Sequence, residues 1–307
     1  MAVKSERWHS AAMKAVLYIL GSVALMALAD ALIKLSSATL SLWQIFVMRS
    51  AVGLPLTAGV ALAAGSRLGL RRPGWALIRS GLLVLTWLLY YASLGVLPLS
   101  VAAAAIYTNP ILTALLTAVV LRRPVGARCW CGMALGFAGM LFVVRPDGAI
   151  SPALALPLLA ALTYAVAMIL THAKCQDESP LALACTLQGA FLLTGLAGSA
   201  VVMLWTPGSG LPFLAGPWGP AGADVWALMA ALALLSVLYF AGVARAYQTG
   251  APPVIAAFDY AYLLWAALWG AVIFAERPTV GMLAGMALIA AGGFLATQKR
   301  GASAPAS

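Results

Sequence analysis

Two ionisable residues, Arg49 and Asp259, lie about two helical turns inside long apolar stretches of the sequence. An ionised group in apolar surroundings is costly unless it is paired or functional, so both are candidates for chemistry. The Arg49 guanidinium can bind a substrate carboxylate through two parallel hydrogen bonds. Asp259 can exchange a proton or pair with an amino group. The alternatives are structural: Arg49 pairs across helices, for instance with Asp30, and Asp259 hydrogen-bonds to a tyrosine or to Arg245.

Asp30 and Lys34 form a second charged pair, four residues apart and therefore on one face of a helix. They lie toward the end of the first apolar stretch. One interpretation is a mutual ion pair, with the Lys34 ammonium reaching toward the polar edge of the protein. The other interpretation is direct contact with a substrate, and the sequence leaves both open.

The dipeptide Asn109-Pro110 falls in the middle of another apolar stretch. Proline has no N–H, so in a helix it frees the carbonyl group four residues earlier, here that of Ile106. A freed carbonyl beside Tyr107 and Asn109 predicts a polar notch that could hold a substrate. A simple helix kink is the alternative.

Aromatic residues are numerous in the apolar stretches, and most of them are expected in the core or at the edges of a membrane. A subset could line a cavity that stacks a flat or cationic ligand. The candidates are Tyr90, Tyr107, Tyr164, Tyr239 and Tyr260.

The composition indicates which elements position these residues. Of 307 residues, 64% are hydrophobic and 8% are charged, and the mean hydropathy is +1.00, whereas soluble domains carry about 25% charged residues. Only a lipid bilayer can cover so much apolar surface, and each crossing needs roughly 20 apolar residues in a helix. The predicted helices are 14–35, 42–64, 75–96, 99–121, 128–145, 153–173, 181–205, 224–248, 252–275 and 279–298.

These ten segments form two related sets of five. Residues 97–124 match residues 251–278 at a constant offset of 154, and Gly132-Met133-Ala134-Leu135 recurs as Gly285-Met286-Ala287-Leu288. Because five is odd, the second copy enters the membrane from the opposite side, which is an inverted repeat. The predicted fold is an all-α integral membrane protein with a first repeat over 14–145 and a second over 146–298, helical from 153. Short tails, 1–13 and 299–307, flank the repeats.

The net charge of +10 reports orientation in the membrane rather than a nucleic-acid partner. Most basic residues fall on one side if the helices alternate, and the positive-inside rule then places both termini in the cytoplasm. These residues are Lys4, Arg7, Lys14, Arg67, Arg71, Arg72, Arg79, Arg122, Arg123, Arg128, Lys174, Arg245, Lys299 and Arg300.

Enzyme and metal chemistry are not expected. Cys129-x-Cys131 with Cys175 could bind a metal, but no His or carboxylate set adjoins them, so small packing residues are the preferred interpretation. The two histidines, His9 and His172, belong to no HExxH motif, and no GxSxG motif occurs. We therefore expect no cofactor and no catalytic residue.

Motifs in both halves resemble the drug/metabolite transporter superfamily, in its ten-helix branch of paired EamA-type domains. In the first half they are Tyr107 to Ala114 (YTNPILTA) and Leu121-Arg122-Arg123-Pro124. In the second half they are Asp259 to Ala266 (DYAYLLWA) and Phe274 to Pro278 (FAERP). The family typically has an acid in this last motif, and Arg122 replaces it in the first copy.

The resemblance implies a transporter of small organic solutes in the bacterial inner membrane, with a cavity between the halves. Similar members export amino acids, nucleobases or toxic metabolites, and some take up vitamins or S-adenosylmethionine. We therefore expect a secondary transporter of a polar or zwitterionic metabolite, working by alternating access, in the efflux direction. The alternative is an uptake permease for a compound such as riboflavin or S-adenosylmethionine. The expected partners are this substrate and the bilayer; proton coupling and a homo-oligomer stay open.

Overall fold

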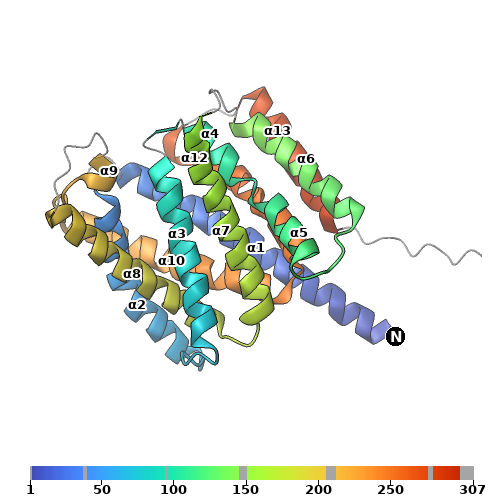
Figure 1. Ribbon diagram of the computed structural model, residues 1–307, viewed down its shortest axis with the longest axis horizontal. Helices are drawn as coiled ribbons and strands as arrows, with labels where there is room; N and C mark the ends of the chain where they lie inside the picture. Colours follow the sequence, from blue (N-terminus) through green and yellow to red (C-terminus); the bar gives the residue numbers. More distant parts are fainter. Residues whose placement is uncertain are drawn as a thin grey trace, which may run out of the picture.

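The structure is a computed structural model that describes residues 2–36, 40–93, 96–97, 99–144, 151–204, 212–275 and 279–297. Helices run roughly side by side in one bundle (Figure 1). Ten helical segments of the described chain are long and apolar enough to cross a membrane. This confirms the predicted all-helical membrane fold.

Eight of the spans are single helices, and two are each divided into a pair of shorter helices. The single helices are α1 (Ala2–Ser36), α2 (Leu42–Ala63), α3 (Pro73–Ser93), α6 (Ala127–Val144), α7 (Ala155–Lys174), α8 (Pro180–Leu204), α10 (Ala223–Thr249) and α13 (Val280–Thr297). The divided spans are α4 (Leu99–Ile106) with α5 (Asn109–Val119), and α11 (Pro252–Asp259) with α12 (Ala261–Phe274). Two short elements, η1 (Pro152–Leu154) and α9 (Pro212–Ala215), lie in connections.

The interruptions differ from the continuous helices predicted over 99–121 and 252–275. The first break falls at Tyr107 and Thr108, and Pro110 explains it, because proline is suited to the first turn of the new helix α5. The second break falls at Tyr260, which has no proline nearby in the helix interior. The two breaks occupy almost equivalent positions in the repeat, so both halves place irregular backbone at the same depth.

Helices α6 and α13 are the equivalent last helices of the two repeats, and they pack closely against each other (Figure 1). A Cβ on Gly132 would lie 2.5 Å from the carbonyl oxygen of Gly292, and one on Gly139 would lie 2.6 Å from that of Gly285. The reverse also holds: a Cβ on Gly292 would meet the carbonyl oxygen of Gly132, and one on Gly285 would meet that of Gly139. Since Gly132 corresponds to Gly285 and Gly139 to Gly292, the contacts exchange under a two-fold axis. Sequence numbers rise on one helix as they fall on the other, so the equivalent helices are antiparallel, as an inverted repeat requires.

Other helix pairs obey the same symmetry. Helix α1 packs on α10, and its counterpart α7 packs on α3, the counterpart of α10. Helices α2 and α8, which are also counterparts, pack against each other. One turn after Gly132 on α6, Gly136 packs against the Tyr260 ring.

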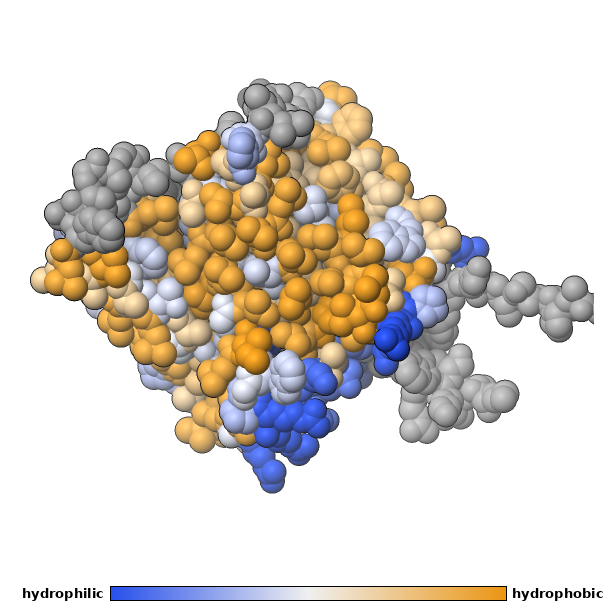
Figure 2. All heavy atoms as spheres, viewed as in Figure 1, coloured by the Kyte–Doolittle hydropathy of each residue, from blue (hydrophilic) through white to orange (hydrophobic). Residues whose placement is uncertain are grey.

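Exposed basic side chains gather at one end of the bundle, called the basic end below. Figure 2 shows apolar side chains over most of one face, with hydrophilic ones at the end where α2 connects to α3. The exposed basic residues are Lys14, Arg67, Arg71, Arg72, Arg122, Arg123, Arg128, Lys174 and Arg245. The connections here are tied together: the backbone N–H groups of Arg71 and Arg72 donate to the Glu178 carboxylate at 3.0 and 2.6 Å.

Three sequence expectations need comment. Arg79, which the sequence grouped with the basic residues of the cytoplasmic side, is buried inside α3 with only 1% of its surface exposed. Helix α1 begins at Ala2, well before the predicted start at residue 14. The side chain of Lys34 and the motif residues 276–278 lie outside the described residues.

Candidate functional site

A small polar cavity lies in the half of the bundle away from the basic end. Helices α1, α2, α3, α8 and α10 enclose it, and its volume is about 10 Å³, roughly the room for one water molecule. Its lining combines both charges with an aromatic wall. The residues are Met26, Asp30, Ile33, Phe46, Arg49, Trp87, Tyr91, Phe191, Tyr239 and Phe240.

Arg49 is the buried cation of this cavity, with 6% of its surface exposed. Its guanidinium carbon lies 5.0 Å from the centre of the Phe191 ring and 5.8 Å from that of Phe46. The Nε atom has no hydrogen-bond partner. A charge at the centre of a membrane helix costs about 2.5–3.5 kcal/mol on insertion scales, and contact with aromatic faces offsets part of this cost. The unpartnered N–H leaves capacity to bind an anionic group.

Asp30 lines the same cavity from α1. One of its carboxylate oxygens, Oδ2, accepts a hydrogen bond of 2.7 Å from the hydroxyl of Tyr262 on α12. The two opposite charges therefore line one space, with an aromatic wall around them. They are complementary to the ammonium and carboxylate groups of a zwitterion, and the cavity would have to widen beyond the volume of one water molecule to admit one.

The connection before α10 closes the cavity on its outer side. Phe213 of α9 contacts the ring of Tyr91, with ring centres 5.8 Å apart. The Trp43 indole N–H donates to the carbonyl of Leu214 at 2.6 Å. Gln44 pairs with the Gly219 backbone, donating to its carbonyl at 2.9 Å and accepting from its N–H at 2.8 Å. These contacts hold the cavity closed from this end.

Asp259 lies apart from the cavity, at the end of the half-helix α11, with 5% of its surface exposed. The Tyr247 hydroxyl donates to its Oδ2 at 2.9 Å, while its Oδ1 has no hydrogen-bond partner. The tyrosine contact is one of the structural alternatives drawn from the sequence. The other, Arg245, is exposed on α10.

Tyr107, at the first helix break, connects the residues around Asp30 with those around Asp259. Its ring centre lies 5.9 Å from that of Tyr262, which binds Asp30, and 6.3 Å from that of Tyr260, the neighbour of Asp259. The irregular segments of both repeats thus meet through aromatic rings, with one acid on either side.

The remaining predicted residues divide between the cavity and the surrounding core. Tyr239 lines the cavity, and Tyr90 contacts the lining residues Trp87 and Tyr91 at ring distances of 6.2 and 5.9 Å. Asn109 is buried, and its Oδ1 has no partner. Pro110 begins α5 beside it. The other two tyrosines, Tyr164 and Tyr260, pack in the core and do not line the cavity.

Sequence reasoning missed Phe46, Trp87, Tyr91 and Phe191 as cavity residues. The cause is that every face of a membrane helix is apolar, so periodicity does not reveal which aromatic rings face inward. The missed Arg79 could have been found, since it lies six residues after Pro73, about 9 Å along the helix and well below the surface.

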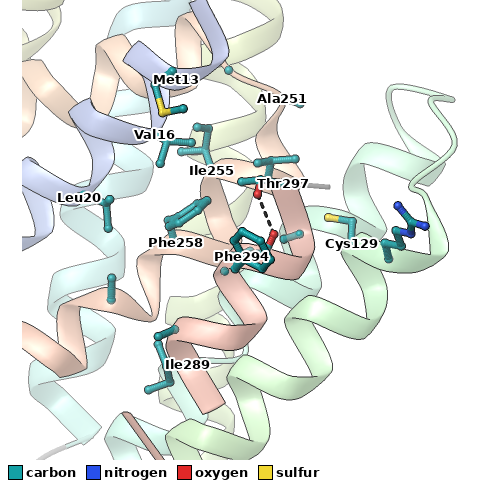
Figure 3. Close-up of a pocket in the computed structure, with 18 of the residues that line it drawn as sticks. Met13, Val16, Leu20, Cys129, Ala251, Ile255, Phe258, Ile289, Phe294 and Thr297 are labelled. Carbon is teal, nitrogen blue, oxygen red and sulfur yellow. Dashed lines mark hydrogen bonds between the residues drawn. The ribbon is translucent and has the colours of Figure 1, made fainter. Parts of the chain in front are cut away.

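A larger hollow of about 1100 Å³ lies at the basic end between α1, α6, α11 and α13 (Figure 3). Figure 3 shows mostly apolar side chains around it, among them Val16, Leu20, Ile255 and Phe258. None of the predicted site residues lines it. Its chemistry suits hydrocarbon chains rather than a polar metabolite, so the smaller charged cavity is the better candidate for substrate binding.

One cysteine, Cys129, lines the larger hollow, and none lines the smaller charged cavity in the described part of the chain. Cys129, Cys131, Cys175 and Cys185 are free thiols. Burial raises the pKa of the Cys175 thiol, outweighing the opposite effect of the nearby Arg79 charge, so this thiol is protonated at neutral pH and unreactive. Within the described residues, no three His, Cys, Asp or Glu side chains gather where they could hold a metal ion.

The ten apolar helices make this a multi-pass membrane protein, and buried charges and interrupted spans are common features of membrane transporters. Residues 13–145 match the sequence profile of the EamA-like transporter family, so the chain carries an EamA-like domain and the resemblance drawn from its motifs is confirmed. No curated protein matches the sequence.

Among solved structures, one that is titled only as the crystal structure of a protein is similar in fold. Its TM-score is 0.75 at 18% identity, and the match covers 94% of this chain and 96% of the other. Identity this low supports the fold alone, over nearly the whole length of both chains.

Proposed function

We propose that the protein is a secondary transporter of small zwitterionic metabolites with amino-acid-like chemistry, which exports them by alternating access. The observation that carries this proposal is the meeting of Asp30 and Arg49 in one aromatic-walled cavity. Arg49 binds the carboxylate of the substrate, Asp30 binds its ammonium group, and rings such as Phe191 and Tyr239 hold the body.

Orientation follows from charge. The basic end faces the cytoplasm, because exposed arginine and lysine residues cluster there and the opposite connections are poor in them. Both termini then lie in the cytoplasm of a bacterial inner membrane. The direction of transport, export, rests on the family resemblance.

Asp259 takes the second role in the proposal, that of the proton-coupling group. It is buried, lies outside the cavity, and keeps one carboxylate oxygen without a partner. It belongs to the short helix α11, which ends at the break beside Tyr260. Gain or loss of a proton at this position changes the charge on a segment that the helix break allows to move.

Counterflow in proteoliposomes tests the substrate class. Vesicles are loaded with an unlabelled mixture of L-amino acids, and entry of the labelled mixture is measured. Competitor mixtures that lack the carboxylate (the matching amines) or the amino group (the matching acids) are expected to leave counterflow intact, while amino acids suppress it. Inhibition by riboflavin or S-adenosylmethionine alone, or an absence of counterflow, contradicts the proposal.

A further inference from the structure

Arg79 is a second buried cation, and it is more completely enclosed than Arg49: its exposed surface is 1% compared with 6%. It lies on α3 in the half of the bundle toward the basic end. Its neighbours Leu77 and Ile78 are exposed on the outer surface of the same turn, so the Arg79 side chain points into the bundle. A surface cation at this end behaves differently: exposed Lys174 places its ammonium 5.3 Å from the centre of the Trp75 ring.

The contacts of Arg79 leave its charge uncompensated. Its Nε donates to the hydroxyl of Thr171 at 2.7 Å, and that hydroxyl donates in turn to the carbonyl of Ala167 at 2.8 Å. Thr171 is neutral, and among the described residues the Nη1 atom of Arg79 has no hydrogen-bond partner. A buried guanidinium with a free N–H is suited to an anionic group that arrives from outside the protein.

Other buried polar atoms without partners in the described chain occur on helices that, like α3, pack against α7. They belong to Asn109 and Thr113 on α5, Gln248 on α10 and Asp259 on α11. Helix α7 packs against α3, α5 and α10, and to a smaller extent against α11, so these helices share one neighbour in the core. Buried polar groups in proteins are nearly always paired, so the unpaired ones call for an explanation, and binding of a polar ligand is one.

The basic end is closed over this region by polar contacts. The Gln248 amide nitrogen donates to the carbonyls of Cys175 and Glu178 at 2.7 and 2.8 Å. Arg123 lies 3.4 Å from the ring nitrogen Nε2 of His172. A route from the basic end to Arg79 would require these contacts to separate.

From this geometry we infer that Arg79 is a second binding residue for the anionic group of the substrate, on the cytoplasmic side of the transport path. The carboxylate passes between Arg79 and Arg49 as the protein alternates. The inference rests on the proposed function, because it assigns the same carboxylate-bearing substrate to both arginines.

Arginine modification in sealed membrane vesicles tests the inference. Phenylglyoxal is applied to inside-out and right-side-out vesicles, and modification of each arginine is measured by peptide mass spectrometry. From the cytoplasmic side, Arg79 is expected to react, and a mixture of L-amino acids abolishes the reaction while the matching amines do not. Arg67, which is exposed at the same end, is expected to react equally with and without amino acids in inside-out vesicles and serves as the reference.

Two outcomes separate this inference from the proposed function. If Arg79 does not react, or reacts without protection while Arg49 is protected from the other side, the inference fails and the proposed function stands. If neither arginine is protected by amino acids, both fail.

A second measurement excludes a merely structural role. Arg79→Lys keeps the charge but loses the fork of donors. In counterflow of the amino-acid mixture, it is expected to raise KM when substrate is offered at the cytoplasmic face and to leave KM at the other face unchanged. An equal change at both faces, or none at either, contradicts the inference.

Discussion

The α6–α13 pair and the two interrupted spans are both built from repeat-related helices, yet they use the repeat in different ways. In α6 and α13 the equivalent glycines are retained, and each contact has a symmetric counterpart. In the interrupted spans the backbone breaks are nearly equivalent, but the side chains are not. Asp259 in α11 corresponds in the repeat to Ala105 in α4.

This difference separates the demands of folding from those of function. Close backbone approach between two helices needs small residues on both, so the α6–α13 pair keeps them in both copies. Binding one asymmetric molecule needs a cation and an acid at different places, so the charged residues occur once. The α6–α13 pair holds the halves together, and the one-sided residues are those to which the proposed function assigns binding.

The largest effect is expected on stability, at the contact between α6 and α13. Gly139→Leu places side-chain atoms where the Gly285 carbonyl lies, and backbone cannot yield as a flexible side chain can. We expect a loss of about 3 kcal/mol of stability and a marked fall in folded yield. Thermal unfolding in detergent measures it. Gly21→Leu, at an exposed glycine with nothing within 4 Å, is the matched control and should unfold like the parent.

The next effect falls on the cavity. Arg49→Gln removes the charge that faces Asp30 while the helices remain packed, so folding is retained and counterflow is lost. Truncating one partner of a buried charge contact typically costs about 2–5 kcal/mol of binding, which is a loss of roughly 30-fold to several thousand-fold in affinity. Counterflow and thermal unfolding are measured on the same preparation, with the exposed-loop variant Arg67→Gln as control. Normal counterflow by the Arg49 variant removes this residue from the site.

The sequence predicts the fold well because its two signals are strong in a membrane protein. Hydropathy locates the ten spans, and the repeat of residues 97–124 fixes their antiparallel arrangement. The sequence also selects Asp30, Arg49 and Tyr239 as candidate site residues, and the structure brings these three to one cavity. These residues are identifiable because charge and polarity inside apolar stretches are rare.

Other features are not readable from the sequence, for reasons specific to lipid. The break at Tyr260 lacks a proline, so no local signal marks it. The depth of Arg79 could have been estimated from its distance to the start of the helix, but only the rotation of the helix shows that its side chain points inward. Rotation is hidden because the lipid-facing and core-facing sides of a membrane helix are equally apolar.

A smaller and more selective effect is expected at the second acid. Asp259→Asn keeps an oxygen that accepts the hydrogen bond from Tyr247 but removes the titrating group. Exchange of substrate without a gradient is therefore expected to persist, while accumulation driven by an imposed pH gradient is lost. Transport into vesicles with and without the gradient measures the two modes. Asp177→Asn, in the exposed α7–α8 connection, should keep both. Gradient-driven transport by the Asp259 variant contradicts a coupling role.

The smallest effect on transport is expected at Tyr262, where the interrupted span α11–α12 contacts Asp30 of the cavity. Tyr262→Phe removes the 2.7 Å hydrogen bond to Asp30 but keeps the ring that packs against Tyr107. A hydrogen bond to a charged group contributes about 1.5–3 kcal/mol, and part of this returns because the freed carboxylate oxygen then binds the substrate ammonium. The expected change in KM is therefore at most several-fold, with maximal rate retained, whereas the exposed control Tyr18→Phe shows none. If Tyr262→Phe instead abolished transport as Arg49→Gln does, Tyr262 itself would belong to the binding site rather than to its support.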